Sequence, residues 1–114
     1  MSEESDLEAI AALLEDETAR RILTETSSQP MSASDLSERC EASKPTVYRR
    51  LDDLRQCDLL VETTRPDPSA GHHHTVYSTN LDRIVVEVEE DSLRLQIDRR
   101  EDMADRFTRL VEGM

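Results

Sequence analysis

Residues 43 to 54 read SKPTVYRRLDDL, and this stretch decides the fold. Val47, Leu51 and Leu54 recur at the spacing of a helix with one apolar stripe, whereas the residues between them are polar or charged. An apolar stripe of this width is typical of a helix that packs against a core with one face only. The opposite face is therefore expected to meet solvent or a partner.

Ser43 and Pro45 predict where this helix begins. A serine side chain can accept a hydrogen bond from the first turn, and proline in that turn lacks only an N–H that would have no helical partner. Upstream, residues 34–40 predict a shorter helix with one apolar edge, and only residues 41–42 separate the two. Two short helices joined so tightly form a helix-turn-helix unit, whose second helix we expect to begin at Ser43 and to include Leu54.

The flanking sequence predicts the elements around this unit. Apolar residues at helical spacing indicate one or two helices over residues 6–27, with a break near residues 15–16. After the second helix the apolar period changes to two, which predicts a strand over 59–64, a loop over 65–74 and a return strand over 75–78. A hairpin that follows a helix-turn-helix is a wing.

A second hairpin and a final helix are expected after the wing. Apolar and polar residues alternate on both sides of a turn at residues 89–92, so one face of this hairpin is apolar and carries Ile84, Val86, Val88, Leu93, Leu95 and Ile97. A two-stranded hairpin is marginally stable alone, so this face is expected to pack on something. The last helical stripe consists of Met103, Phe107, Leu110, Val111 and Met114.

Together these elements predict an α+β fold, a winged helix-turn-helix with an extra C-terminal β-hairpin and a C-terminal dimerisation helix. We expect residues 6–80 to form the winged helix-turn-helix domain and residues 81–114 to form the hairpin and the helix. The expected dimer contact joins the stripes of two chains through Met103, Phe107, Leu110 and Val111. The alternative is that Phe107 and Leu110 pack on the hairpin of their own chain, and both arrangements can hold together.

The chain is acidic, with a formal net charge of −12. Lys44 is its only lysine, and the other basic residues are arginines. The acidic residues are spread along the chain, and the strong apolar periodicity argues against disorder. This composition is typical of proteins from halophilic organisms, in which molar salt shortens the Debye length to about 3 Å. Net acidity therefore does not exclude nucleic acid as the partner.

Several function classes are excluded or disfavoured by what the sequence lacks. It has no long apolar run and no signal-peptide pattern at its start, which predicts a soluble, cytoplasmic protein without a membrane partner. It has no Ser/His/acid set, no glycine-rich phosphate loop and no metal-ligand spacing, so we expect neither an enzyme nor a cofactor. We interpret Cys40 and Cys57 as small buried residues at helix ends, with a redox or metal role as the alternative.

Residues 43–50 reverse the sign of the chain, because they carry three positive charges and no negative one. If the apolar stripe faces inward, Pro45, Thr46 and Arg49 point outward, where the second helix of a helix-turn-helix enters the major groove. Arg49 is the expected base reader, because its planar fork can bond guanine O6 and N7 together. Thr46 offers its methyl or hydroxyl group to a base edge.

The remaining DNA contacts are expected on the flanks of this helix and on the wing. The expected phosphate ligands are Ser43, Lys44, Tyr48, Arg50 and Arg65. For the run His72, His73 and His74 three interpretations stay open: a minor-groove or phosphate contact, an exposed loop, and a metal site, which consecutive residues serve poorly. For the helix itself, the alternative is a solvated face whose arginines pair with nearby carboxylates.

The runs MSASDLS (31–37), SKPTVYRRL (43–51) and DLLV (58–61) resemble the winged helix-turn-helix regulators of halophilic archaea, which are grouped with the ArsR-like superfamily. The resemblance implies a dimer, a recognition helix at 43–56 and a wing at 59–79. Metal-sensing members carry paired cysteines in the helix before the recognition helix. This chain has only Cys40 there, so heavy-metal sensing is not supported.

The sequence therefore predicts a sequence-specific, DNA-binding transcriptional regulator that acts as a homodimer on a palindromic operator. The competing interpretation is a winged-helix module for protein contact in a transcription or replication complex. No residue pattern names a small-molecule effector.

Overall fold

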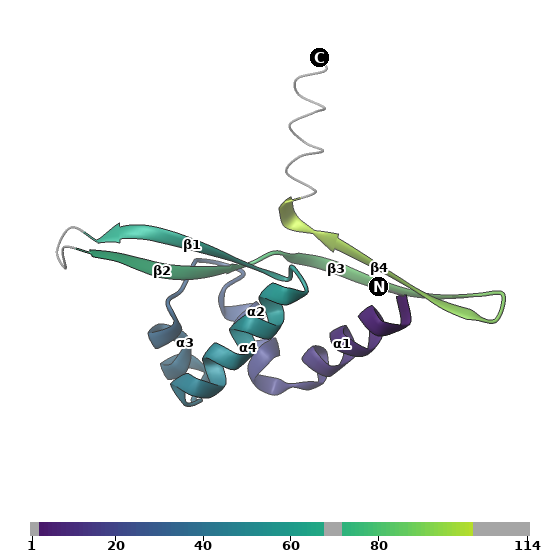
Figure 1. Ribbon diagram of the computed structural model, residues 1–114, viewed down its shortest axis with the longest axis horizontal. Helices are drawn as coiled ribbons and strands as arrows, with labels where there is room; N and C mark the ends of the chain where they lie inside the picture. Colours follow the sequence, from purple (N-terminus) through teal and green to yellow (C-terminus); the bar gives the residue numbers. More distant parts are fainter. Residues whose placement is uncertain (1–2, 68–71, 102–114) are drawn as a thin grey trace, which may run out of the picture.

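The computed structural model describes residues 3–67 and 72–101, in which four helices precede two β-hairpins (Figure 1). The helices are α1 (Glu3–Glu15), α2 (Glu17–Glu25), α3 (Ala33–Cys40) and α4 (Lys44–Gln56). The strands are β1 (Leu60–Asp67), β2 (His72–Thr79), β3 (Leu81–Glu89) and β4 (Ser92–Arg99). β1 pairs with β2 and β3 with β4, both antiparallel, as two separate sheets. This α+β arrangement fits a winged helix-turn-helix with β1–β2 as the wing.

Capping side chains set the helix starts. The break predicted near residues 15–16 is confirmed: the Asp16 carboxylate accepts a hydrogen bond of 2.8 Å from the backbone N–H of Ala19 and caps α2. Ser32 caps α3, and Ser43 caps α4 as predicted. Pro45 lies in the first turn of α4, where it displaces no helical hydrogen bond.

The turn between α3 and α4 is held by Glu41 in the left-handed region, with φ of 52°. This conformation usually favours glycine and costs a residue with a side chain about 1 kcal/mol. The Glu41 N–H bonds to the Glu38 carbonyl at 3.3 Å and the Ala42 N–H to the Ser37 carbonyl at 3.2 Å, so the turn is closed by its own backbone. It fixes the direction in which α4 leaves α3.

The core lies between the helices and the base of the wing. The predicted stripe of α4 is confirmed, since Val47, Leu51 and Leu54 are 0%, 2% and 0% exposed. Burying each of these side chains stabilises the fold by about 1.5–3 kcal/mol. The other members of the core are Ile10, Leu13, Ala19, Ile22, Leu23, Met31, Ala33, Leu36, Cys40, Leu59, Leu60 and Tyr77.

The wing is longer than the sequence predicts. The loop expected over residues 65–74 is wrong at both ends, because Arg65 pairs with His74, Pro66 with His73 and Asp67 with His72 in the β1–β2 ladder. Proline is typical of turns, but in a two-stranded ribbon every second N–H points away from the partner strand. Both strands of a two-stranded sheet are edge strands, where a proline such as Pro66 is tolerated.

Met31 adds a short bridge to the wing, which the sequence does not predict. Its N–H donates to the Tyr77 carbonyl at 3.0 Å, and the Tyr77 N–H donates to the Met31 carbonyl at 2.8 Å. The start of α3 is thereby attached to β2. The helix-turn-helix and the wing share one core as a result.

The β3–β4 hairpin and its turn are confirmed, and its apolar residues face each other in register: Ile84 with Ile97, Val86 with Leu95 and Val88 with Leu93. The half near the helices packs against the core. The half near the turn does not, because Val86, Val88 and Leu93 are 52%, 77% and 47% exposed. The sequence predicts that the apolar face of this hairpin is covered. Within one chain, only the half near the helices is covered.

Asn80 joins the two hairpins and is only 3% exposed. Its N–H donates to the Leu59 carbonyl at 2.9 Å, and its side-chain amide donates to the Asp58 carbonyl at 3.0 Å. Its own carbonyl accepts from the N–H of Arg100 at 2.7 Å. Through its backbone and its side chain, this one residue ties the end of α4 to both hairpins, which extend to opposite sides of the helices (Figure 1).

Two further expectations concern the ends of the chain. The predicted C-terminal helix, with Met103, Phe107, Leu110 and Val111, lies outside the described residues. The predicted division of the chain into a winged helix-turn-helix domain that ends at residue 80 and a C-terminal unit that begins at residue 81 stays a prediction. Within residues 3–67 and 72–101, no helix is both long and apolar enough to cross a membrane.

Candidate nucleic-acid interface

The first half of α4 presents an exposed, basic surface. Lys44, Pro45 and Arg49 are exposed, and Tyr48 is 55% exposed. Among the residues that the structure describes, neither Lys44 nor Arg49 forms an ion pair. Both charges are therefore available to a partner, on the face opposite the buried stripe.

Ser43 and Thr46 form a closed pair at the start of α4. The Ser43 hydroxyl donates to Thr46 Oγ1 at 3.0 Å and accepts from the Thr46 N–H at 3.4 Å. Ser43 is exposed and Thr46 is half-buried. Their predicted contacts with DNA stay predictions, and a base contact by the Thr46 hydroxyl would have to coexist with this bond.

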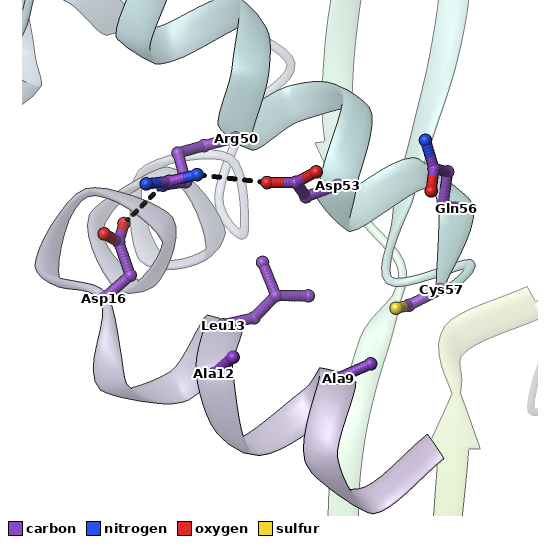
Figure 2. Close-up of a pocket in the computed structure, with 8 residues that line it drawn as sticks. All are labelled: Ala9, Ala12, Leu13, Asp16, Arg50, Asp53, Gln56 and Cys57. Carbon is purple, nitrogen blue, oxygen red and sulfur yellow. Dashed lines mark hydrogen bonds and ion pairs between the residues drawn. The ribbon is translucent and has the colours of Figure 1, made fainter. Parts of the chain in front are cut away.

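Arg50 lies on the flank of α4 that faces α1, where two carboxylates hold it (Figure 2). Its Nε lies 3.1 Å from Asp16 Oδ2, and its Nη1 lies 3.1 Å from Asp53 Oδ2. The side chain of Arg50 is 27% exposed. The sequence indicates only a helix break near Asp16, so this link between α4 and the α1–α2 junction is not predicted. The phosphate contact proposed for Arg50 stays a prediction.

The wing carries the other predicted DNA contacts. Arg65 and His74 are exposed and lie opposite each other in the β1–β2 ladder. His72 and His73 continue β2 toward the tip of the wing, where they pair with Asp67 and Pro66 in the β1–β2 ladder. The structure therefore places Arg65 beside the histidine run, and places both on the wing and not on α4.

An ion pair fixes the wing to α4. Arg55 Nη1 lies 2.8 Å from Glu62 Oε2, which joins the last turn of α4 to β1. Burial raises the pKa of the Tyr77 phenol above its ordinary value of 10.0, Glu62 and Tyr48 add to the rise, and Arg55 opposes it. Tyr77 is therefore a neutral group at the joint between α4 and the wing. Sequence reasoning missed Glu62, because nothing local marks a partner seven residues away across a change of element.

The two cysteines are free thiols. Burial raises the pKa of Cys40 above 9.0, with Glu25 adding to the rise and Arg21 opposing it. Burial also raises the pKa of Cys57, with carboxylates nearby adding to the rise. A raised pKa leaves little thiolate, the form that reacts and binds metals. Within the described part of the chain, no three His, Cys, Asp or Glu side chains gather where a metal ion could bind.

Part of this chain is similar to a known protein family. Residues 14–64 match the family model of a helix-turn-helix domain, from the end of α1 into β1. Among solved structures, the chain is similar to an ArsR-like transcriptional regulator from Rhodococcus sp. RHA1, at 21% identity over 96% of this chain and 76% of that chain, with a TM-score of 0.48. A search of curated proteins finds no match. Residues 14–64 are therefore similar to a helix-turn-helix domain, in agreement with the order of α2, α3 and α4.

Proposed function

We propose that this protein is a sequence-specific, DNA-binding transcriptional regulator of the ArsR-like type. It acts as a homodimer on double-stranded DNA in the high-salt cytoplasm of a halophilic archaeon. The helix-turn-helix match over residues 14–64 supports the class of protein. The distribution of its unpaired cations supports the site, and this observation carries the proposal.

Most arginines of the described residues contact their own chain, through carboxylates or backbone carbonyls; these are Arg20, Arg39, Arg50, Arg55, Arg83, Arg94, Arg99 and Arg100. The described cations without such a contact are Arg21, Lys44, Arg49 and Arg65. Three of these four lie on α4 or the wing. In an acidic chain, unpaired cations are thus concentrated on the two elements that would meet DNA.

Each side chain then has a role that follows from its position. Arg49 reads a base pair, and a bidentate contact to guanine provides about 1–3 kcal/mol of discrimination. Lys44 and Arg65 bind phosphates, as do Tyr48, Ser43 and the N–H groups at the start of α4. The histidine run at 72–74 follows the backbone or the minor groove beside the wing. Arg50 would reach a phosphate through donors of its guanidinium group other than the Nε and Nη1 atoms that face Asp16 and Asp53.

The homodimer is supported by apolar surface that one chain leaves exposed. Val86, Val88 and Leu93 share one face of the β3–β4 hairpin, on the side of the molecule opposite the wing (Figure 1). The predicted stripe of residues 103–111 follows directly in the sequence. A twofold axis on this side would place the wings outermost, and two recognition helices that bind half-sites one turn of DNA apart would then lie about 34 Å from each other. The operator is then palindromic.

High salt explains why an acidic chain can bind an acidic polymer. Binding through phosphates weakens steeply as salt rises, because it depends on counterion release. At molar salt, repulsion from carboxylates beyond about 3 Å is also screened. Contacts made directly at the bases therefore provide a larger share of the affinity, and Arg49 is the residue best placed for them.

The test is selection from sheared genomic DNA by the purified protein in molar KCl, followed by sequencing, with an Arg49→Ala variant beside it. We expect enrichment of a few sites that share a palindrome, and loss of this enrichment in Arg49→Ala. Arg94→Ala is the matched control, since Arg94 is an exposed arginine on the β3–β4 hairpin, away from α4.

Uniform recovery of DNA, or enrichment that survives Arg49→Ala, would overturn the base-reading role. Recovery of no DNA at all would favour the protein-contact interpretation, in which the α4 surface meets an acidic protein. Loss of enrichment in both variants would show that total charge, and not the position of Arg49, governs binding.

A further inference from the structure

A groove runs between α1 and α4, on the flank of the recognition helix that carries Arg50 (Figure 2). It has two parts with volumes of about 340 and 350 Å³, and Ala9, Gln56 and Cys57 line both of them. Pockets that hold small molecules usually have volumes of roughly 300–1,000 Å³. The groove is therefore large enough for a compact organic ligand.

The floor of the groove is apolar because α1 turns small residues toward it. Ala9 and Ala12 are one helical turn apart and exposed, and Leu13 lies beside them. Cys57, at the end of α4, closes the floor from the other side (Figure 2). Leucine in place of either alanine would fill this space, so the groove exists because these two side chains are short.

The walls of the groove carry more negative than positive charge. Four carboxylates line it, those of Asp6, Asp16, Asp53 and Asp58, against the guanidinium groups of Arg50 and Arg99. Arg99 directs its N–H groups to the backbone carbonyls of Cys57 and Asp58, at 2.8 and 3.0 Å. Among the described residues, Arg99 forms no ion pair with a carboxylate of the groove, so the four carboxylates still outnumber the two guanidinium groups.

The thiol of Cys57 reports the same imbalance. Burial is the largest cause of its raised pKa. Among the charged groups, Asp6, Asp53 and Asp58 raise the pKa further, and only Arg99 lowers it. The middle of the groove is therefore a region of negative potential above an apolar floor.

The contact between Arg50 and Asp16 closes one end of the groove, and its geometry is imperfect. Arg50 Nε is 3.1 Å from Asp16 Oδ2, yet this buried N–H makes no hydrogen bond because its direction is wrong. The ion pair is thus held by charge and not by a directed bond. A competing cation can replace it without breaking a well-formed hydrogen bond.

We propose that this groove binds a small organic cation with an apolar body, whose charge takes the place of Arg50 beside Asp16. The apolar body lies on Ala9, Ala12 and Leu13. Because Arg50 and Asp53 belong to α4, occupation of the groove changes how the recognition helix is held against α1. This second consequence, lower affinity for DNA, rests on the proposed function, whereas the binding itself does not.

The probe is tetraphenylphosphonium, titrated into the full chain in molar NaCl by isothermal calorimetry. Tetraphenylborate, which has the same shape and the opposite charge, is the control ligand. We expect one cation to bind per chain, at least about tenfold more tightly than the anion. Equal binding of both ions, or no binding of the cation, overturns the proposal.

Two matched pairs of variants locate the site. Ala12→Phe fills the groove, whereas Ala11→Phe adds the same bulk to an exposed position of α1 outside it. Asp53→Asn removes a carboxylate of the groove, whereas Asp52→Asn removes its neighbour, which bonds Gln56. The first of each pair should weaken cation binding at least about tenfold and the second by less than about twofold. Equal effects within a pair overturn the location.

A third arm tests the coupling to DNA. Saturating tetraphenylphosphonium should release DNA from the wild-type chain but not from Ala12→Phe, and unchanged retention overturns the coupling. Because the calorimetry is done without DNA, the hypothesis of cation binding and the hypothesis of DNA binding can be refuted independently. A chain that binds the cation but no DNA contradicts the proposed function, and one that binds DNA but no cation contradicts only this inference.

Discussion

Asp16 has two roles, and its replacement by alanine should measure both. The carboxylate caps α2 by accepting from the Ala19 N–H at 2.8 Å and also pairs with Arg50 at 3.1 Å. Loss of a cap costs about 1 kcal/mol. The side chains of Asp16 and Arg50 are 30% and 27% exposed, so solvent and salt screen the pair and its loss costs about 0.5–1 kcal/mol. Asp16→Ala should therefore lower the unfolding free energy by about 1.5–2 kcal/mol and Tm by roughly 6–12 °C.

Asp16→Asn separates the two roles, because asparagine caps helices as well as aspartate does but carries no charge. We expect it to cost only the part due to the ion pair, and to cost nothing further in an Arg50→Gln background. Urea denaturation followed by far-ultraviolet circular dichroism measures all five chains (the wild type, Asp16→Ala, Asp16→Asn, Arg50→Gln and the double variant), at low and at molar KCl. The reasoning is refuted if Asp16→Asn destabilises as much as Asp16→Ala, or if molar KCl leaves the cost of Asp16→Asn unchanged.

Two further predictions concern the hairpin and the thiols. Val88→Asp should weaken association, measured by sedimentation equilibrium, and should leave the monomer folded because Val88 is 77% exposed. The control is Gln96→Asp, which adds the same charge to another exposed site of the hairpin and should not weaken association. Equal association of the two variants would contradict the dimer surface. The fold favours the neutral thiol of Cys57, because its pKa is raised above 9.0 in the folded chain. The resulting contribution to the unfolding free energy is full below pH 9.0 and is lost as the pH rises through the raised pKa. The unfolding free energy should fall over this alkaline range by less in Cys57→Ala than in the wild type, and an identical fall in both would show that Cys57 is not responsible.

The sequence predicts the helix-turn-helix well because its signals are local. The stripe of Val47, Leu51 and Leu54, the Ser43 cap and Pro45 in the first turn all act within one helix, and each is found where expected. The break before α2 is predictable for the same reason, since Asp16 caps the helix that follows it. Local chemistry determines these features whatever the rest of the chain does.

Features that depend on distant partners are not predictable in this way. The wing extends through Pro66 because pairing with β2 continues past the residues that look like a turn. Arg50 meets Asp16 across thirty-four positions of the sequence, and the spacing of neither residue indicates it. The alternation in β3–β4 predicts an apolar face, but only the tertiary structure decides that Ile84 and Ile97 are covered and Val88 is not.

The candidate DNA surface differs from the rest of the described chain because its cations lack partners within the chain, and not because of the net charge. Where molar salt screens charges beyond about 3 Å, neither the total charge nor a distant carboxylate can steer a partner. A cation that already contacts its own chain must leave that contact before it binds another. Lys44, Arg49 and Arg65 have no such contact among the described residues, whereas Arg55, on the same helix, is held by Glu62 at 2.8 Å. Arg55→Ala should therefore change DNA affinity less than Arg49→Ala, although both remove one positive charge from α4.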